Sequence, residues 1–110
     1  MPTKFRPVEE YRMLKKNYTK TGKFCRVTFK LSAEVNAETA ALCGDFNNWD
    51  PDIHPMKRLK DGSFSTTVSM PSGQLYRFRY LLDGERWEND WEADAYISNE
   101  YGNDDSVVEV

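Results

Sequence analysis

The architecture is indicated most clearly by the stretch Tyr76-Arg77-Phe78-Arg79-Tyr80-Leu81-Leu82-Asp83-Gly84-Glu85-Arg86-Trp87. Large apolar side chains alternate with arginines in its first part, and a period of two is typical of a half-buried β-strand. Asp-Gly is a favoured pair in tight turns, so the chain should reverse after Leu82 and return in a short arm that begins at Trp87. The stretch therefore predicts an antiparallel sheet with one face in the core and the other in solvent. Arg79 is expected on the solvent face.

Strand-like patterns recur along the rest of the chain, in residues 23–31, 40–44, 56–60, 63–70 and 106–110. Asp61-Gly62 predicts a two-residue hairpin turn, and Pro71-Ser72-Gly73 predicts another reversal. With residues 76–82 and the arm at Trp87, these segments make seven short strands. We therefore expect an all-β fold, an immunoglobulin-like antiparallel β-sandwich. The Cys-Trp-Cys framework of true immunoglobulin domains is missing, so the fold should be of another lineage.

The first 20 residues differ from this pattern. Pro7 can open a helix, and Val8, Tyr11 and Leu14 are spaced to form one apolar stripe. A helix of at most three turns is too short to be stable alone, so it must pack on an edge of its own domain or on a partner. We expect a short helical or irregular extension over residues 1–20, followed by a single β-sandwich module over residues 21–110.

Composition narrows the class of protein further. The chain has 110 residues and a formal net charge of -3, with a pI near 5.2, which argues against nucleic acid as a partner. No apolar run approaches the ~20 residues of a membrane span, and the N-terminus lacks the apolar core of a secretory signal. We expect a cytoplasmic protein with Cys25 and Cys43 as free thiols. His54 is the only histidine, which removes most metal sites and catalytic triads.

A second informative stretch is Gly44-Asp45-Phe46-Asn47-Asn48-Trp49-Asp50-Pro51. Its polar residues predict a surface turn, and a tryptophan there must either pack back onto the core or be covered by something else. Trp87 also follows a turn. Flat rings bind the apolar face of a sugar, and planar or amide groups bind its hydroxyls. Trp49 and Trp87 with Arg79 therefore suggest a sugar platform. Further candidates to bind sugar hydroxyls are Asn47, Asn48 and Asn103. A loop anchor is the alternative interpretation of each tryptophan, and we assign that role to Trp91.

These motifs, with the closing Asn-Asp-Asp-Ser-Val-Val, together resemble one family over about residues 23–110. They are similar to the glycogen- and starch-binding modules of the isoamylase N-terminal (early set) type, carbohydrate-binding module family 48. Such modules occur in branching and debranching enzymes and in the β subunit of AMP-activated protein kinase. The resemblance implies an early-set immunoglobulin-like β-sandwich that binds α-glucans.

The resemblance also implies roles for individual residues. Trp49 and Trp87 hold the positions of the two rings that stack on glucose. Arg79 holds the position of a lysine that bonds sugar hydroxyls. Tyr101 stands where the family has an apolar residue of a late loop, and Asp105 where it has an asparagine before the final strand.

We therefore expect a non-catalytic, free-standing α-glucan-binding module with no cofactor and no metal, and with a glycogen-metabolising enzyme as a possible partner. A structural or adaptor domain that pairs with such an enzyme without binding sugar is the main alternative. A glycosidase would need two carboxylates at a set separation. We interpret the many acidic residues of this chain as solvated loop residues instead. A calcium site at Asn103-Asp104-Asp105 lacks a ligand loop of known spacing. The sequence gives no indication of the oligomeric state.

Overall fold

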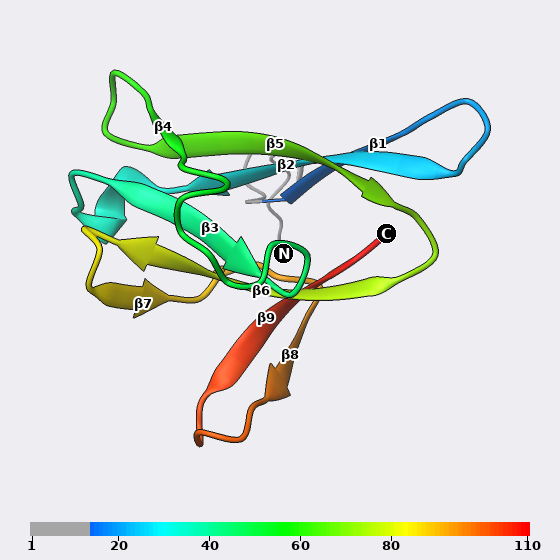
Figure 1. Cartoon of the computed structure of the whole chain (residues 1–110). Helices are drawn as coiled ribbons and strands as arrows, with labels where there is room; N and C mark the ends of the chain where they lie inside the picture. Colours follow the sequence, from blue (N-terminus) through cyan, green and yellow to red (C-terminus); the bar gives the residue numbers. More distant parts are fainter. Residues whose placement is uncertain (1–13) are drawn as a thin grey trace, which may run out of the picture.

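The computed structural model describes residues 14–110 as two packed antiparallel sheets (Figure 1). One sheet has the strand order β1-β2-β5-β4. The other has the order β3-β6-β9-β8, and β7 pairs with β6 beside it. The strands are β1 Leu14–Tyr18, β2 Phe24–Leu31, β3 Ala40–Gly44, β4 Lys57–Arg58, β5 Phe64–Pro71, β6 Leu75–Leu82, β7 Arg86–Glu88, β8 Ala95–Ser98 and β9 Asp104–Glu109. A short 3-10 helix, η1 Ala33–Val35, links β2 to β3. The predicted immunoglobulin-like β-sandwich is confirmed.

The core forms because β2 and β6 each turn every second side chain toward the other sheet. Phe29 of β2 and Phe78 of β6 are fully buried and meet edge to face, with ring centroids 5.1 Å apart. Tyr80 adds a further edge contact to Phe78, at 5.6 Å. The alternate residues of β6, Arg77 and Arg79, consequently lie on the outer face of the second sheet, as predicted.

One polar group is buried with these rings. The Asp90 side chain is 0 % exposed, and it accepts hydrogen bonds from Tyr80 Oη at 2.8 Å and from the Glu92 amide at 2.8 Å. Burial raises the pKa of Asp90 to about 6, although both hydrogen bonds act in the opposite direction. The chain between β7 and β8 is therefore attached to the core through a titratable group.

The prediction of a helix is wrong where it meets the described residues. Leu14 was expected on an apolar helical stripe, but it begins β1 and pairs with Phe29 of β2. A strand here satisfies the backbone groups at the edge of β2 and buries Leu14 to 4 % exposure. The predicted boundary at residue 20 thus falls after a strand of the sandwich. Pro7, Val8 and Tyr11 lie outside the described residues.

β1 also contacts the other sheet. Lys16 Nζ lies 2.7 Å from Asp94 Oδ2, and the same oxygen accepts a hydrogen bond from the Glu109 amide of β9 at 2.7 Å. The first and last strands therefore meet at one carboxylate.

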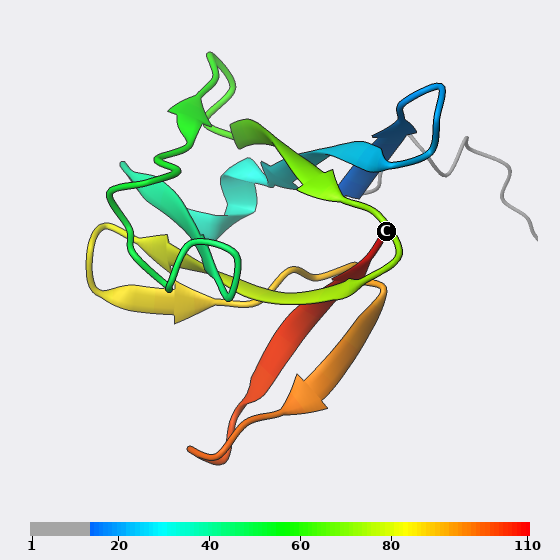
Figure 2. The same ribbon diagram turned by 45° about the vertical axis from the view of Figure 1, so that its right-hand side comes forward.

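One turn and one strand differ from their sequence-based expectations. The Leu59 amide bonds to the Ser63 carbonyl, so the predicted two-residue hairpin turn contains three residues, with Gly62 at a φ of 88°. β8 was not predicted, because its residues are mostly exposed and show no clear alternation. Figures 1 and 2 show the β8–β9 hairpin extending away from the rest of the sandwich.

Cys25 and Cys43 are buried and unpaired, as predicted. Within residues 14–110 no helix has the length and apolar character needed to cross a membrane.

Candidate functional site

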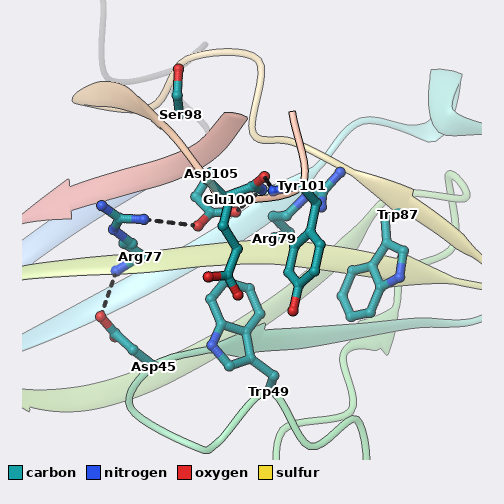
Figure 3. Close-up of a pocket in the computed structure, with 10 residues that line it drawn as sticks. Asp45, Trp49, Arg77, Arg79, Trp87, Ser98, Glu100, Tyr101 and Asp105 are labelled. Carbon is teal, nitrogen blue, oxygen red and sulfur yellow. Dashed lines mark hydrogen bonds and ion pairs between the residues drawn. The ribbon is translucent and has the colours of Figure 1, made fainter. Parts of the chain in front are cut away.

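A cleft of about 610 Å³ lies on the outer face of the second sheet, where the β3–β4 loop, the β6–β7 hairpin and the β8–β9 loop converge (Figure 3). It is lined by Asp45, Trp49, Arg77, Arg79, Trp87, Ser98, Asn99, Glu100, Tyr101 and Asp105. Two indoles and a phenol are thus gathered around one opening, with two guanidinium groups and three carboxylates.

Asn47 builds the turn that carries Trp49. Its side chain is buried, and its Oδ1 accepts a hydrogen bond from the Gly44 amide at 2.9 Å. Its Nδ2 donates to the Leu42 carbonyl and to His54 Nδ1, both at 2.9 Å, so the imidazole acts as an acceptor. The Trp49 amide then bonds to the Gly44 carbonyl at 2.8 Å. Asn47 therefore has a structural role and does not line the cleft.

Gly44 is required where this turn begins. A Cβ at this position would lie 2.5 Å from the Arg77 carbonyl oxygen and 2.4 Å from Phe46 Cε2. The Arg77 backbone approaches this closely because its amide donates to Asp45 Oδ2 at 3.1 Å, which continues the pairing of β3 with β6. Asp45 thereby fixes the cleft edge to the central strand.

The two aromatic residues of the turn point in different directions. Phe46 packs on the core, with its ring centroid 6.0 Å from that of Tyr76 and 6.3 Å from that of Phe29. Trp49, at a φ of 59°, is only partly covered and lines the cleft. Because Phe46 anchors the loop, the turn does not need Trp49 for that purpose.

Trp87 is positioned by the β6–β7 hairpin. Asp83 and Gly84 both have positive φ, and Asp83 Oδ1 accepts the amides of Glu38 and Thr39 at 2.8 and 3.0 Å. The hydrogen bond from Thr39 lowers the pKa of Asp83 most, and the one from Glu38 lowers it further. Arg86 donates to the Asn36 carbonyl at 3.1 Å, so the hairpin is attached to the β2–β3 connection.

The exposed indole of Trp87 is contacted by Arg79. The Arg79 Cζ lies 5.6 Å from the Trp87 ring centroid, within range of a cation–π interaction. Among the described residues the buried Arg79 Nε has no hydrogen-bond partner. Trp87 is 45 % exposed, so a flat apolar surface remains open beside the Arg79 guanidinium.

The loop between β8 and β9 is organised by Asn99. Its Oδ1 accepts the amides of Tyr101 and Asn103 at 2.9 and 3.1 Å, and its Nδ2 donates to Asp105 Oδ1 at 3.1 Å. Tyr101, at the tip, is 80 % exposed, and a hydrogen bond with Glu100 raises the pKa of its phenol. A phenol is thus presented over the cleft by a loop that its own hydrogen bonds hold together.

Asp105 lies in β9 and is 5 % exposed. Its Oδ2 is 3.4 Å from Arg77 Nη1, and its other oxygen accepts from Asn99. The carboxylate therefore links the central strand to the β8–β9 loop within the protein.

The structure brings five of the seven predicted site residues to the cleft: Trp49, Arg79, Trp87, Tyr101 and Asp105. Asn48 and Asn103 are exposed but are not among the lining residues. Trp91, expected to be a loop anchor, is 46 % exposed and donates its indole N–H to Glu88 Oε2 at 2.9 Å.

Sequence reasoning missed Asp45, Arg77, Ser98, Asn99 and Glu100 as lining residues. The alternation of Arg77 with Arg79 on one face of a strand was a usable signal for Arg77. Residues 98–100 gave no signal, because β8 itself was not predicted.

Exposed rings beside arginines and carboxylates suit an uncharged polyhydroxyl ligand that has an apolar face. The described residues contain no group of histidine, cysteine, aspartate or glutamate side chains arranged to hold a metal ion. The fold and the cleft therefore define a β-sandwich binding module with an aromatic site on one sheet.

Comparison with known proteins agrees with this class. The sequence model of carbohydrate-binding module 48 (isoamylase N-terminal domain) matches residues 15–97. The chain belongs to this family, which consists of carbohydrate-binding modules rather than catalytic domains.

Three curated relatives are each described as "1,4-alpha-glucan branching enzyme GlgB". The protein of Halothermothrix orenii is 40% identical over 48 residues, which cover 42% of this chain and 8% of the relative. That of Butyrivibrio fibrisolvens is 35% identical over 65 residues, covering 57% of this chain and 10% of the relative. That of Photobacterium profundum is 33% identical over 81 residues, covering 71% of this chain and 11% of the relative. The similarity thus spans about a tenth of each of these enzymes.

Proposed function

We propose that this chain binds α-glucans such as glycogen or starch without catalysing a reaction, and that glucose units stack on Trp49 and Trp87. The observation that carries the proposal is that both indoles line one cleft. Membership of carbohydrate-binding module family 48 supports carbohydrate as the class of ligand.

The other lining groups fit a sugar chain. Arg79 offers guanidinium donors beside the Trp87 ring, with Cζ 5.6 Å from the ring centroid. Tyr101, which is 80 % exposed, provides a third ring at the opening. Asn48 and Asn103, which lie outside the lining, are assigned contacts with the flanking parts of a longer glucan.

The expected affinity for a short oligosaccharide is weak. If each indole covers ~100 Å² of sugar, burial contributes about 2.5 kcal/mol per ring at ~25 cal/mol/Å². Association costs several kcal/mol, which leaves a Kd of roughly micromolar to millimolar. A polymer that repeats the same unit compensates for this weakness, so a polysaccharide suits the site better than a scarce small sugar.

We also propose that the module acts beside a glycogen-metabolising enzyme and supplies no catalytic group itself. The named activity of the relatives is glucan branching, and the matched segment covers about a tenth of their length. In the cleft, the Asp105 carboxylate forms an ion pair with Arg77 and a hydrogen bond with Asn99. The Asp45 carboxylate accepts a hydrogen bond from the Arg77 amide. These engaged carboxylates favour binding over acid–base chemistry.

An adaptor that has lost sugar binding is the second candidate. The observation in its favour is Asp105, which stands where the family has an asparagine. Its carboxylate is 5 % exposed and hydrogen-bonded within the protein, which removes one sugar contact. This candidate keeps the partner enzyme but predicts no affinity for glucan.

Electrophoresis in native gels with and without glycogen tests the proposal. We expect glycogen to retard the wild type, and Trp49→Ala or Trp87→Ala to abolish most of the retardation. Trp91→Ala is the matched control, because Trp91 is as exposed as Trp87 (46 % and 45 %) but lies outside the cleft lining. Circular dichroism verifies that each variant is folded.

The other outcomes are equally informative. A wild type that migrates identically in both gels supports the adaptor. Release of reducing sugar from glycogen by the purified chain contradicts a purely binding role.

A further inference from the structure

The outer face of the four-stranded sheet carries positive charge without negative charge. The register of β1, β2, β5 and β4 places on this face Lys15, Asn17, Phe24, Arg26, Thr28, Lys30, Lys57, Ser65, Thr67, Ser69 and Pro71. We call these eleven residues the basic face. All four of its cations are exposed, and none of its members is an aspartate or a glutamate.

The charges of the basic face are not neutralised within residues 14–110. The ion pairs there involve Lys16, Arg77 and Arg86, none of which belongs to the basic face. Asp61, in the β4–β5 turn, has a lowered pKa mainly because Ser63 hydrogen-bonds to it, and Lys30 adds a small effect. Four like charges on one flat surface are unfavourable for the isolated domain, and an anionic partner would relieve the repulsion.

The sequence of residues 1–13 does not favour that segment as the anionic partner. Residues 1–13 contain Lys4, Arg6 and Arg12 but only Glu9 and Glu10, so their side chains sum to a positive charge. The whole chain has a net charge of -3, which makes a cationic face a local exception.

We propose that the basic face docks an acidic polypeptide segment of a partner protein. Arg26 and Lys30 lie four residues apart on β2, a separation of roughly 13 Å at ~3.3 Å per residue. An extended peptide repeats its side chains on one side every ~6.7 Å, so carboxylates four residues apart match this pair. Between the cations, the Thr28 and Thr67 hydroxyls are hydrogen-bonded to each other at 2.9 Å, which leaves one hydroxyl proton to donate to a carboxylate.

The chemistry of the basic face favours polypeptide over nucleic acid. Single-stranded nucleic acid is bound by stacking platforms in a positively charged groove, whereas Phe24 is the one ring on this face, and it is 46 % exposed. A nucleic acid long enough to bind tightly would also extend past the face toward the acidic remainder of the molecule. A short acidic segment avoids that repulsion.

The basic face belongs to the sheet of β1, β2, β5 and β4, and the aromatic cleft to the other sheet. Figure 1 shows how the two sheets lie. A partner on the first sheet therefore leaves the cleft open, and the docking inference does not depend on the proposed glucan binding.

Fluorescence anisotropy with a labelled oligoglutamate peptide at low ionic strength tests the inference. We expect the wild type to bind the peptide, and Arg26→Ser with Lys30→Ser to weaken binding about tenfold. The matched control is Lys20→Ser with Lys60→Ser, which removes the same charge from two exposed turns outside the basic face and should change the affinity less than twofold. Both double variants should keep the wild-type thermal unfolding transition and the same retardation by glycogen, taken as the ratio of mobilities in gels with and without the polysaccharide.

Three results would overturn the inference: no binding by the wild type, equal losses in the two double variants, or a stronger response to single-stranded DNA or phosphatidylserine vesicles than to the peptide.

Discussion

The Arg79 guanidinium lies over the Trp87 indole, with Cζ 5.6 Å from the ring centroid. The contact joins adjacent strands of one hairpin and limits the movement of a ring that is otherwise 45 % exposed. A cation–π contact at such a site contributes about 0.5–1 kcal/mol. We expect this contact to order the ring before a ligand arrives and so to reduce the entropy cost of the proposed stacking.

Replacing Arg79 tests this ordering. We expect Arg79→Met to increase acrylamide quenching of tryptophan fluorescence and to weaken glycogen retardation severalfold, because both the cation and its donors are lost. Arg26→Met, on the other sheet, should change neither measurement. Unchanged quenching in Arg79→Met would show that the guanidinium does not restrain Trp87.

Asn47 is expected to be the most sensitive residue of the Trp49 turn. Asn47→Ala leaves the Gly44 amide and the Leu42 carbonyl without their partner, and an unsatisfied buried group costs about 1–3 kcal/mol. Urea unfolding should show a loss of this size together with weaker glycogen retardation. Asn48→Gly is the control for the urea measurement, since Asn48 is exposed and its φ of 57° suits glycine. A loss as large for Asn48→Gly would refute the special role of Asn47.

Asn99 is predicted to affect glucan binding by positioning Tyr101. Asn99→Ala removes the acceptor of the Tyr101 and Asn103 amides, so the loop should lose its shape while the sandwich remains folded. We expect Asn99→Ala to reduce glycogen affinity as much as Tyr101→Ala does, and to lower thermal stability because the buried Asp105 Oδ1 loses its hydrogen bond. Asn103→Ala keeps its backbone amide and should have a smaller effect.

Asp90 should make the stability of the domain depend on pH. Its pKa of about 6 in the folded protein exceeds the ordinary value of 3.8, so the protonated form is favoured by folding. The corresponding contribution is fully present below pH 3.8 and is lost as the pH rises through about 6.

The Asp90→Asn variant isolates this contribution, because asparagine does not titrate. The stability of Asp90→Asn relative to the wild type should rise by about 2 kcal/mol between about pH 4.5 and pH 7, as measured by urea unfolding. The comparison between variants cancels the opposite trend from carboxylates with lowered pKa values, such as Asp83. A difference that is constant with pH would mean that Asp90 ionises normally.

The sandwich was predictable because its central strands have regular alternation. Phe29 and Phe78 lie on strongly apolar faces, and each is flanked by polar neighbours that point outward. Leu14 was placed on a helix because Val8, Tyr11 and Leu14 fit a period of 3.6. The open edge of β2 outweighed this local preference, and such a long-range pairing is not visible in a short window of sequence.

The candidate site was predictable in part. Trp49 and Trp87 follow recognisable turns, so the sequence could place both rings at the surface. The roles of Asn47 and Asn99 depend on hydrogen bonds to the backbone of bent loops, and an asparagine in a polar segment looks the same whether it is buried or exposed. Asp105 appeared to be a loop residue, since the pattern placed the start of the last strand at residue 106 rather than at Asp104.

The shared carboxylate of Asp94 has a consequence for how the domain comes apart. Lys16 of the first strand and the Glu109 amide of the last strand both bond to it, although they are distant in sequence. Fraying of β1 should therefore weaken the attachment of β9 to Asp94, and fraying of β9 should weaken that of β1. Loss of secondary structure and loss of tertiary contacts should therefore coincide in a single cooperative transition.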